Sequence, residues 1–295
     1  MSDPLRLAIE QALGREEPGQ WRHAGTTGPT DAWSLATGGA RYFVKIAAGR
    51  HADMIACEAD GLRAIAATHT IRVPSLAAAA LHEQSGWLAV EWLEIAGPPS
   101  ACLGNALARL HRAQAPRGPN GERFGWHRDN WIGATPQANT WSDDWCTFFR
   151  ERRLAPQLAL AAANGHAGAL QRDGERVLAA LPALLRGHDV APSLVHGDLW
   201  AGNAATLADG DGAVFDPAVH VGDREVDVAM TELFGGFGED FLAAYRNAWP
   251  LDAGYPLRRE LYNLYHLLNH VNLFGAAYVA RTQRTLAALL AAIGR

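Results

Sequence analysis

The feature that most constrains the fold of this chain is a change of pattern at Gly97-Pro98-Pro99. Before it, extended segments are separated by glycine-rich turns at residues 25–29 and 37–39, as in consecutive antiparallel strands. After it, the chain shows mainly helical periodicity. We therefore predict an α+β fold with a small antiparallel-sheet N-terminal lobe, residues 1–96, and a larger, mainly helical C-terminal lobe, residues 97–295.

The N-terminal lobe is predicted to contain a sheet of about five strands and one main helix. The third strand includes the sequence YFVKIA, where alternation places Phe43, Lys45 and Ala47 on one face. The main helix is expected over residues 53–68, with Glu58 near its centre, and a short helix over residues 3–14 precedes the sheet.

Composition excludes several classes of protein. The net charge of -5 and the lack of a long basic run argue against nucleic-acid binding. No window reaches the roughly 18 apolar residues that a membrane helix needs. The three cysteines are far apart and odd in number, which favours a reducing compartment over a disulfide framework. We expect a cytoplasmic protein that acts as a monomer.

The basic residues are divided very unevenly between lysine and arginine. Among 26 lysine and arginine residues, Lys45 is the single lysine. Lysine carries a compact ammonium on a flexible aliphatic chain, and the planar guanidinium of arginine does not reproduce it. Because Lys45 lies on a strand after a glycine-containing turn and before a helix that carries Glu58, we favour a specific role over an arbitrary lysine.

A second group of polar residues lies in the C-terminal lobe. Asp198 and Asn203 are five residues apart, and Asp216 closes a short predicted strand further along. Each could instead be an ordinary turn residue. Together with Lys45 and Glu58, however, they supply what phosphoryl transfer from ATP needs: a phosphate-binding cation, its carboxylate partner, a base and oxygen ligands for Mg²⁺.

Several segments identify a family. LVHGDLWAGN, FDPAVHVGDREVDVAM, ELFGGF and LYHLLNHVNLFG closely resemble the fructosamine kinase (ketosamine-3-kinase) family, and YFVK, CEADGL, RVPSL, ALARLH and the tryptophan-rich stretch from FGWHRDNW to FFRERRL are similar as well. The resemblance runs from about residue 25 to residue 275. It implies a two-lobed protein-kinase-like fold of the aminoglycoside-phosphotransferase-like group.

The resemblance also implies roles for individual residues. Asp198 would be the catalytic base, Lys45 would bind phosphate while paired with Glu58, and Asn203 and Asp216 would hold Mg²⁺. Further ATP contacts are expected from the first turn and from the hinge between the lobes, namely Gly25, Thr26, Thr27, Gly28, Glu91, Trp92 and Leu93. The turn departs from the family's usual adjacent glycines, and Pro29 offers no N–H.

The acceptor pocket is expected to contain aromatic residues. Aromatic faces stack on sugar rings and attract cationic amines, so the candidates are Trp200, Trp126 and Trp131, with Asp223 as a further polar candidate. Two neighbouring residues are assigned to structure instead. The ring of His196 should hydrogen-bond to backbone, and Asp227 should accept hydrogen bonds from the segment around Asp198.

The leading interpretation is an ATP- and Mg²⁺-dependent kinase for a sugar hydroxyl of a ketosamine, free or on a glycated protein. The resemblance implies that phosphorylation destabilises the adduct and so repairs glycated amines. One alternative is a kinase for another small hydroxyl compound, such as an aminoglycoside, choline or a free sugar. Others are a nucleotide-binding pseudokinase and, less favoured, a metal hydrolase that uses histidine and aspartate clusters.

Overall fold

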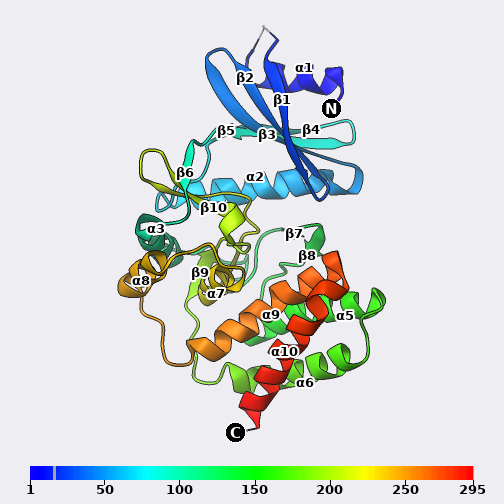
Figure 1. Cartoon of the computed structure of the whole chain (residues 1–295), viewed down its shortest axis with the longest axis vertical. Helices are drawn as coiled ribbons and strands as arrows, with labels where there is room; N and C mark the ends of the chain where they lie inside the picture. The colour runs from blue at the N-terminus through cyan, green and yellow to red at the C-terminus, as the bar shows by residue number, and fades with distance from the viewer. Residues whose placement is uncertain (16–17, 295) are drawn as a thin grey trace.

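The structure is a computed structural model that describes residues 1–15 and 18–294. Its N-terminal part is an antiparallel sheet with strand order β1-β2-β3-β5-β4 (Figure 1). These strands are β1 (Gln20–Thr27), β2 (Thr30–Thr37), β3 (Ala40–Ala48), β4 (Leu76–His82) and β5 (Ser85–Glu91). The predicted antiparallel sheet is confirmed, and Lys45 lies on β3 as expected.

Two helices cover opposite faces of this sheet. Ile9 of α1 (Asp3–Ala12) packs in one cluster with Val44 of β3. Ile55 of α2 (Ala52–Ala67) packs in another cluster with Ala47 of the same strand. Residues of opposite parity on a strand face opposite sides, so each helix buries its apolar stripe against a different face. Both predicted helices are confirmed, with ends shifted by one or two residues.

Helices dominate the rest of the chain, as the sequence predicted. The long helix α9 (Tyr255–Phe274) packs against α5, α7 and α10, and most of its buried apolar residues belong to one large apolar cluster (Figure 1). The helices other than α9 are α3 (Ala101–Arg112), α4 (Trp145–Phe149), a π-helical turn (Arg150–Leu154), α5 (Ala155–Ala163), α6 (Ala169–Leu184), α7 (Glu225–Leu233), α8 (Glu239–Ala248) and α10 (Ala276–Ile293).

Short strands join the two parts and carry the polar segments. β10 (Ala204–Leu207) pairs with β11 (Gly212–Val214) and with β6 (Ile95–Gly97), which follows the N-terminal sheet. β9 (Pro192–Val195) pairs with β12 (His220–Asp223), and β7 (Asn130–Ile132) pairs with β8 (Thr135–Gln137). Asp198 follows β9, and Asp216 lies between β11 and β12, so both are placed where the two parts meet.

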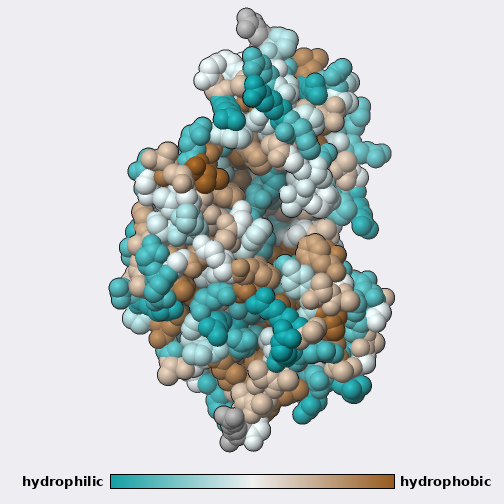
Figure 2. All heavy atoms as spheres, in the orientation of Figure 1, coloured by the Kyte–Doolittle hydropathy of each residue, from teal (hydrophilic) through white to brown (hydrophobic). Residues whose placement is uncertain are grey.

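The surface is hollowed at this junction. Figure 2 shows a recess between the upper and lower halves, with hydrophilic side chains in it. No helix within the described residues is long and apolar enough to cross a lipid bilayer. Cys57, Cys102 and Cys146 are all free thiols.

Candidate active site

Lys45 is held between two carboxylates that come from different elements. Its Nζ lies 2.6 Å from Oε2 of Glu58 on α2 and 2.9 Å from Oδ1 of Asp216. Only 13% of each side chain in the Lys45–Glu58 pair is exposed, so water screens the pair weakly. The register across the sheet places Gly25 of β1 in the same row as Lys45, through Ala32 of β2. The structure therefore brings together the predicted lysine, its partner and one predicted metal ligand.

The ionisation of these three groups reflects burial and mutual charge. Burial opposes the charge on Lys45, but Asp216 and Glu58 outweigh it and raise the pKa of the ammonium above its usual value. Burial raises the pKa of Glu58 to about 8, against the pull of Lys45. Burial also opposes ionisation of Asp216, yet its contacts with Lys45 leave its pKa lowered. One ammonium thus lies between two carboxylates. Because the negative charge of the two carboxylates exceeds the charge of one ammonium, the cluster would accommodate a further cation.

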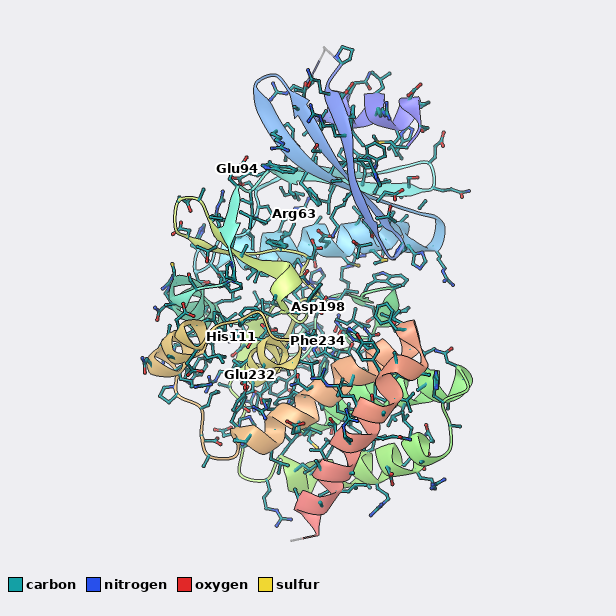
Figure 3. All side chains as sticks on the ribbon, in the orientation of Figure 1. Arg63, Glu94, His111, Asp198, Glu232 and Phe234 are labelled. Carbon is teal, nitrogen blue, oxygen red and sulfur yellow. The ribbon has the colours of Figure 1, made fainter. Side chains whose placement is uncertain are left out.

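Asp198 and Asn203 orient each other in the segment that follows β9. The amide Nδ2 of Asn203 donates to the backbone oxygen of Asp198 at 2.9 Å and to its Oδ2 at 3.2 Å. Figure 3 shows Asp198 at the junction between the sheet-bearing part and the helical part. Burial, with the charge of Asp216 as the second cause, raises the pKa of Asp198 to about 7. A carboxylate with such a pKa is suited to accept a proton near neutral pH.

The backbone before Asp198 is fixed by a buried carboxylate. Asp227 of α7 accepts hydrogen bonds from the backbone N–H of His196 at 2.7 Å and from that of Gly197 at 2.8 Å. The ring Nε2 of His111 lies 3.1 Å from the same carboxylate. Although burial opposes its ionisation, these hydrogen bonds lower the pKa of Asp227, which therefore stays charged. The predicted structural role of Asp227 is confirmed.

The ring of His196 connects Asp198 with the segment that leads to Asp216. Its Nε2 lies 2.9 Å from the carbonyl oxygen of Phe215, and its Nδ1 lies 3.3 Å from the backbone nitrogen of Asp198. Burial lowers the pKa of His196, so the ring is neutral. It therefore donates to Phe215 and accepts from Asp198, which confirms the predicted role of His196 in fixing the loop.

The two predicted metal ligands have suitable chemistry. Both amide contacts of Asn203 use Nδ2, and its Oδ1 accepts no hydrogen bond from the described residues. Asp216 adopts a φ of 57°, a left-handed conformation that is uncommon outside glycine and is often found at functional sites. An amide oxygen and a carboxylate are ligands that Mg²⁺ accepts, so the residues present fit this ion.

The predicted phosphate turn is the end of the β1–β2 hairpin. β1 runs to Thr27, and residues 28–29 form the turn. A Cβ added at Gly25 would meet no atom within 4 Å, so the backbone there has room for a ligand. The hydroxyl of Thr26 donates to Oδ1 of Asp31 at 2.7 Å and is already engaged. The Thr26 hydroxyl is therefore committed to Asp31, and the space beside Gly25 is what this turn leaves open to a phosphate.

The hinge residues differ in which of their hydrogen-bonding groups remain available to a ligand. The carboxylate of Glu91 pairs with Arg72 and accepts from the backbone N–H of Ser75 at 3.1 Å. The N–H of Trp92 donates to a β3 carbonyl at 3.2 Å. The N–H of Leu93 makes no hydrogen bond with the described residues. The Glu91 side chain is thus committed to structure, whereas the backbone N–H of Leu93 has no partner among the described residues.

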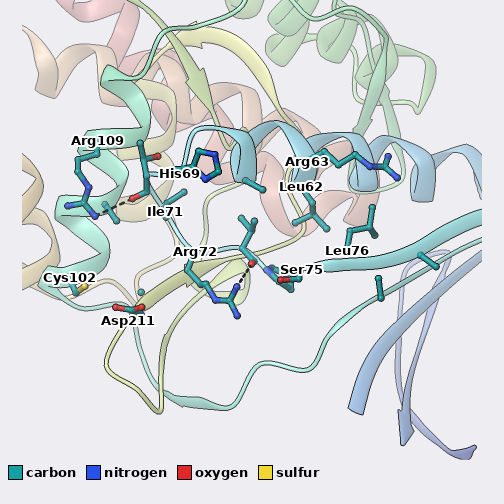
Figure 4. A pocket seen from close by; sticks show the side chains of 18 residues that line it. Leu62, Arg63, His69, Ile71, Arg72, Ser75, Leu76, Cys102, Arg109 and Asp211 are labelled. Atoms are coloured by element: carbon teal, nitrogen blue, oxygen red, sulfur yellow. Dashed lines mark hydrogen bonds between the residues drawn. The ribbon is translucent and has the colours of Figure 1, made fainter. Parts of the chain in front are cut away.

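A separate cavity lies away from these residues. It has a volume of about 730 Å³ and lies between α2, the segment of residues 69–78 and α3 (Figure 4). Two of its lining arginines are engaged, because Arg72 pairs with Glu91 and Arg109 donates to the carbonyl of Thr70 at 3.2 Å. Neither Lys45 nor the residues around Asp198 line it, so it is not part of the candidate active site.

Two of the predicted acceptor residues stay available. Trp200, two residues after Asp198, is 42% exposed. Its ring lies over Gly202, where a Cβ would come within 2.3 Å of the indole, so glycine makes room for it. Trp131 on β7 is half-buried, with its ring centroid 5.6 Å from that of His51.

The expectations for Trp126 and Asp223 are corrected. Trp126 is 7% exposed in an apolar cluster, and its indole N–H donates to Oδ2 of Asp60 at 2.7 Å. Asp223 is 2% exposed, and its Oδ2 lies 2.6 Å from Nε2 of His188 and accepts from the hydroxyl of Tyr262. Both side chains are saturated by neighbouring protein groups, which leaves no face for a substrate.

One cluster within the described residues has the composition of a metal site. It consists of His188, Glu225 and Asp252. Arg258 already pairs with both carboxylates, with its Nε 2.7 Å from Glu225 and its Nη2 2.8 Å from Asp252. These positive contacts make the cluster an internal ion-pair network, and it gives the metal-hydrolase alternative no support.

Sequence reasoning missed two residues that support the site, Asp60 and His111. The partner of Asp60, Trp126, is 66 residues away, and that of His111, Asp227, is 116 residues away. Such separations give no periodic signal. His111 does end the ALARLH segment quoted above, so that resemblance was the one available indication of its importance.

The chain matches known proteins over most of its length. The family model described as fructosamine kinase matches residues 3–292. A Synechocystis protein named a probable ketoamine kinase is 45% identical over 86% of this chain and 84% of its own length. The chloroplastic protein-ribulosamine 3-kinase of Arabidopsis thaliana is 40% identical, covering 80% of this chain and 72% of its own.

Solved structures extend the similarity to the fold. A candidate fructosamine-3-kinase from Thermobifida fusca shares 32% identity, covers 98% of this chain and 99% of its own, and has a TM-score of 0.86. An aminoglycoside phosphotransferase at 16% identity, covering 97% and 98%, has a TM-score of 0.65 and shares the fold alone. The predicted protein-kinase-like fold is confirmed, and the chain belongs to the fructosamine kinase family.

Proposed function

We propose that this protein transfers the γ-phosphoryl group of ATP to a sugar hydroxyl of a ketosamine, with fructosamine and ribulosamine adducts as the candidate substrates. The observation that carries the proposal is the placement of Asp198 beside a Lys45–Glu58–Asp216 cluster in a chain of this family. A base and a phosphate-binding cation in one recess are the two protein groups that such a transfer requires.

In the proposed reaction the acceptor hydroxyl attacks the γ-phosphorus, and the bond from that phosphorus to the β,γ-bridging oxygen breaks. The hydroxyl proton passes to Asp198, and ADP leaves with the bond electrons. Lys45 binds phosphate oxygens, and Glu58 holds its ammonium in position. Asn203 and Asp216 would hold Mg²⁺, which supplies positive charge to the phosphates when bound.

The surroundings of this centre suggest how the two substrates are oriented. The free N–H of Leu93 is the proposed donor to adenine, and backbone N–H groups of residues 25–28 are proposed to contact phosphate. Trp200 and Trp131 are proposed to stack on the sugar of the acceptor. Trp200 is the stronger candidate because it is exposed two residues from the proposed base.

The biological role follows from the chemistry of the family. We propose that phosphorylation of the sugar labilises the adduct, so that the amine is released and a glycated amino acid, peptide or protein is repaired. Three free thiols are consistent with a reducing compartment such as the cytoplasm. We also propose a monomer, with its lobes divided between residues 96 and 97, within β6, a strand that pairs with β10 and not with the N-terminal sheet.

A substrate panel tests the proposal. Purified protein is supplied with ATP and Mg²⁺ together with ribulosamine, fructosamine, an aminoglycoside, choline or free sugars, and ADP release is measured. We expect turnover of at least one ketosamine and at least about tenfold lower kcat/KM for the other acceptors. Turnover of an aminoglycoside or choline without any ketosamine would replace the proposal with the alternative kinase. No turnover of any acceptor, with ATP still bound, would favour the pseudokinase.

A further inference from the structure

A loop of the helical part of the protein is hydrogen-bonded to α2, the helix that carries Glu58. This loop, residues 125–139, contains the β7–β8 hairpin. The indole N–H of Trp126 donates to Oδ2 of Asp60 at 2.7 Å, and Nη2 of Arg128 lies 2.6 Å from Oδ1 of Asp53. Asp53 and Asp60 lie seven residues apart on α2 and flank Glu58, so the two contacts hold α2 on both sides of the residue that pairs with Lys45.

A third contact lies between these two. Sγ of Cys57 lies 3.6 Å from the carbonyl oxygen of Asp129 and 3.3 Å from Oδ2 of Asp53, so its one proton is shared between the loop and α2. Burial raises the pKa of Cys57 to about 12, so the group is a thiol and not a thiolate. Loop residues 126–129 thus contact α2 over two helical turns, and Glu58 follows Cys57 directly in the chain.

The same loop also holds the segment that carries Asp216. Nδ2 of Asn130 donates to the carbonyl of Val219 at 2.8 Å, and Gly125 exchanges two backbone hydrogen bonds with Val221. The Asp216 segment packs closely on α2 as well, because a Cβ at Gly61 would lie 3.0 Å from Cγ of Pro217. One loop therefore connects both carboxylates that flank Lys45.

The loop itself is braced from the helical part. Buried Arg153 donates to the carbonyl of Ala138 at 2.6 Å and to Oδ1 of Asn139 at 2.7 Å. The amide nitrogen of Asn139 donates in turn to the carbonyl of Arg128 at 3.1 Å. Since Arg153 is 1% exposed and Asn139 is fully buried, this bracing is rigid on the helical side.

We propose that the 125–139 loop is a fixed clamp that holds α2 in the position where Glu58 meets Lys45, with Asp60 and Arg128 as positioning residues for ATP. The protein then needs no covalent modification to bring α2 into place. This inference rests on the proposed roles of Lys45 and Glu58, and it assigns Trp126 to nucleotide positioning and not to acceptor binding.

The primary test compares Asp60→Ala with Asp60→Asn in the full-length protein. The alanine variant leaves the indole N–H of Trp126 without an acceptor, whereas the asparagine variant keeps a side-chain oxygen for it. We expect Asp60→Ala to lose about tenfold in kcat/KM for ATP with an unchanged KM for the ketosamine, and Asp60→Asn to stay within about threefold of wild type. Arg246→Ala, which removes an exposed ion pair with Glu239 on α8, is the matched control.

Amide hydrogen exchange of α2 gives a readout that does not depend on catalysis. Exchange over residues 52–67 should rise in Asp60→Ala and stay at the wild-type level in Asp60→Asn and Arg246→Ala. Unchanged exchange together with wild-type kcat/KM for ATP would overturn the clamp. So would a loss confined to the KM for the ketosamine, because the loop would then belong to the acceptor site.

A double-mutant cycle keeps the proposal falsifiable if Asp60→Ala does not fold. Arg128 and Asp53 are partly exposed, so Arg128→Ala, Asp53→Ala and the double variant should fold. We expect smaller losses of about threefold in the single variants and no further loss in the double variant. Losses that simply multiply would contradict the clamp.

Lys45→Ala is measured in parallel: if it remains fully active, the proposed site is wrong, whatever the exchange data show for α2.

Discussion

Oδ2 of Asp198 accepts a hydrogen bond from Nδ2 of Asn203 at 3.2 Å, so the proposed base and a proposed metal ligand fix each other's orientation. The amide nitrogen faces Asp198, which leaves the amide oxygen free for a cation. The same carboxylate lies close enough to Asp216 for the charge of Asp216 to raise its pKa. Proton transfer and phosphate binding are therefore organised by neighbouring groups and not by separate sites.

Lys45→Arg should impair the use of ATP although it preserves the positive charge. The Lys45 ammonium fits between Oε2 of Glu58 and Oδ1 of Asp216, and a planar guanidinium is too wide to keep both contacts. We expect kcat/KM for ATP to fall about 100-fold in steady-state assays. Thermal unfolding should shift by only a few degrees. An arginine variant within threefold of wild type would show that this geometry is not required.

Asp227→Asn should disturb catalysis through the backbone of the catalytic segment. The amide offers only one acceptor oxygen, so an N–H of His196 or Gly197 would face an amide NH₂ group. We expect a loss of about 1–3 kcal/mol in the free energy of unfolding and more than a tenfold fall in kcat. Chemical denaturation and initial rates measure the two effects. Asp240→Asn on the exposed face of α8 is the control and should match wild type.

The His188–Asp223 pair should make stability depend on pH. Burial opposes the charge on His188, but its hydrogen bond to Asp223 and the charge of Asp223 raise its pKa above 6.5. A raised pKa means that the protonated ring stabilises the fold, fully below pH 6.5 and progressively less as pH rises through the folded-state pKa.

The free energy of unfolding of wild type should therefore decline over that range relative to His188→Gln. Urea denaturation at several pH values measures this difference. If the free energies of unfolding of the two proteins differ by a constant amount from pH 5.5 to about 9, the charge of the His188–Asp223 pair contributes nothing to stability.

The sequence predicted the parts of the fold and site that depend on local pattern. Strand alternation placed Lys45 on β3, and helical periodicity placed Glu58 on α2. The five-residue spacing of Asp198 and Asn203 indicated a shared segment, and the structure joins them by two hydrogen bonds.

What the sequence did not reveal depends on contacts between distant elements. Trp126 was a candidate for acceptor binding because aromatic rings suit sugars, but its partner on α2 is 66 residues away and no spacing rule links them. Asp223 was a polar residue near a functional motif, and only the packing of β12 against His188 and Tyr262 showed that it is buried. Whether distant residues satisfy the hydrogen bonds of a polar side chain depends on the folded structure, and no sequence pattern shows it.

The most direct test of the central claim is the product formed from ATP, Mg²⁺ and a ketosamine by wild type and by Asp198→Asn. Mass spectrometry and ADP assays should show one phosphoryl group added to the ketosamine for each ADP released by wild type. Asp198→Asn should bind ATP normally, but its kcat should be lower by about 10²–10⁴-fold. A variant that forms the phosphorylated product at the wild-type rate, or a wild-type protein that releases ADP without it, would contradict the account.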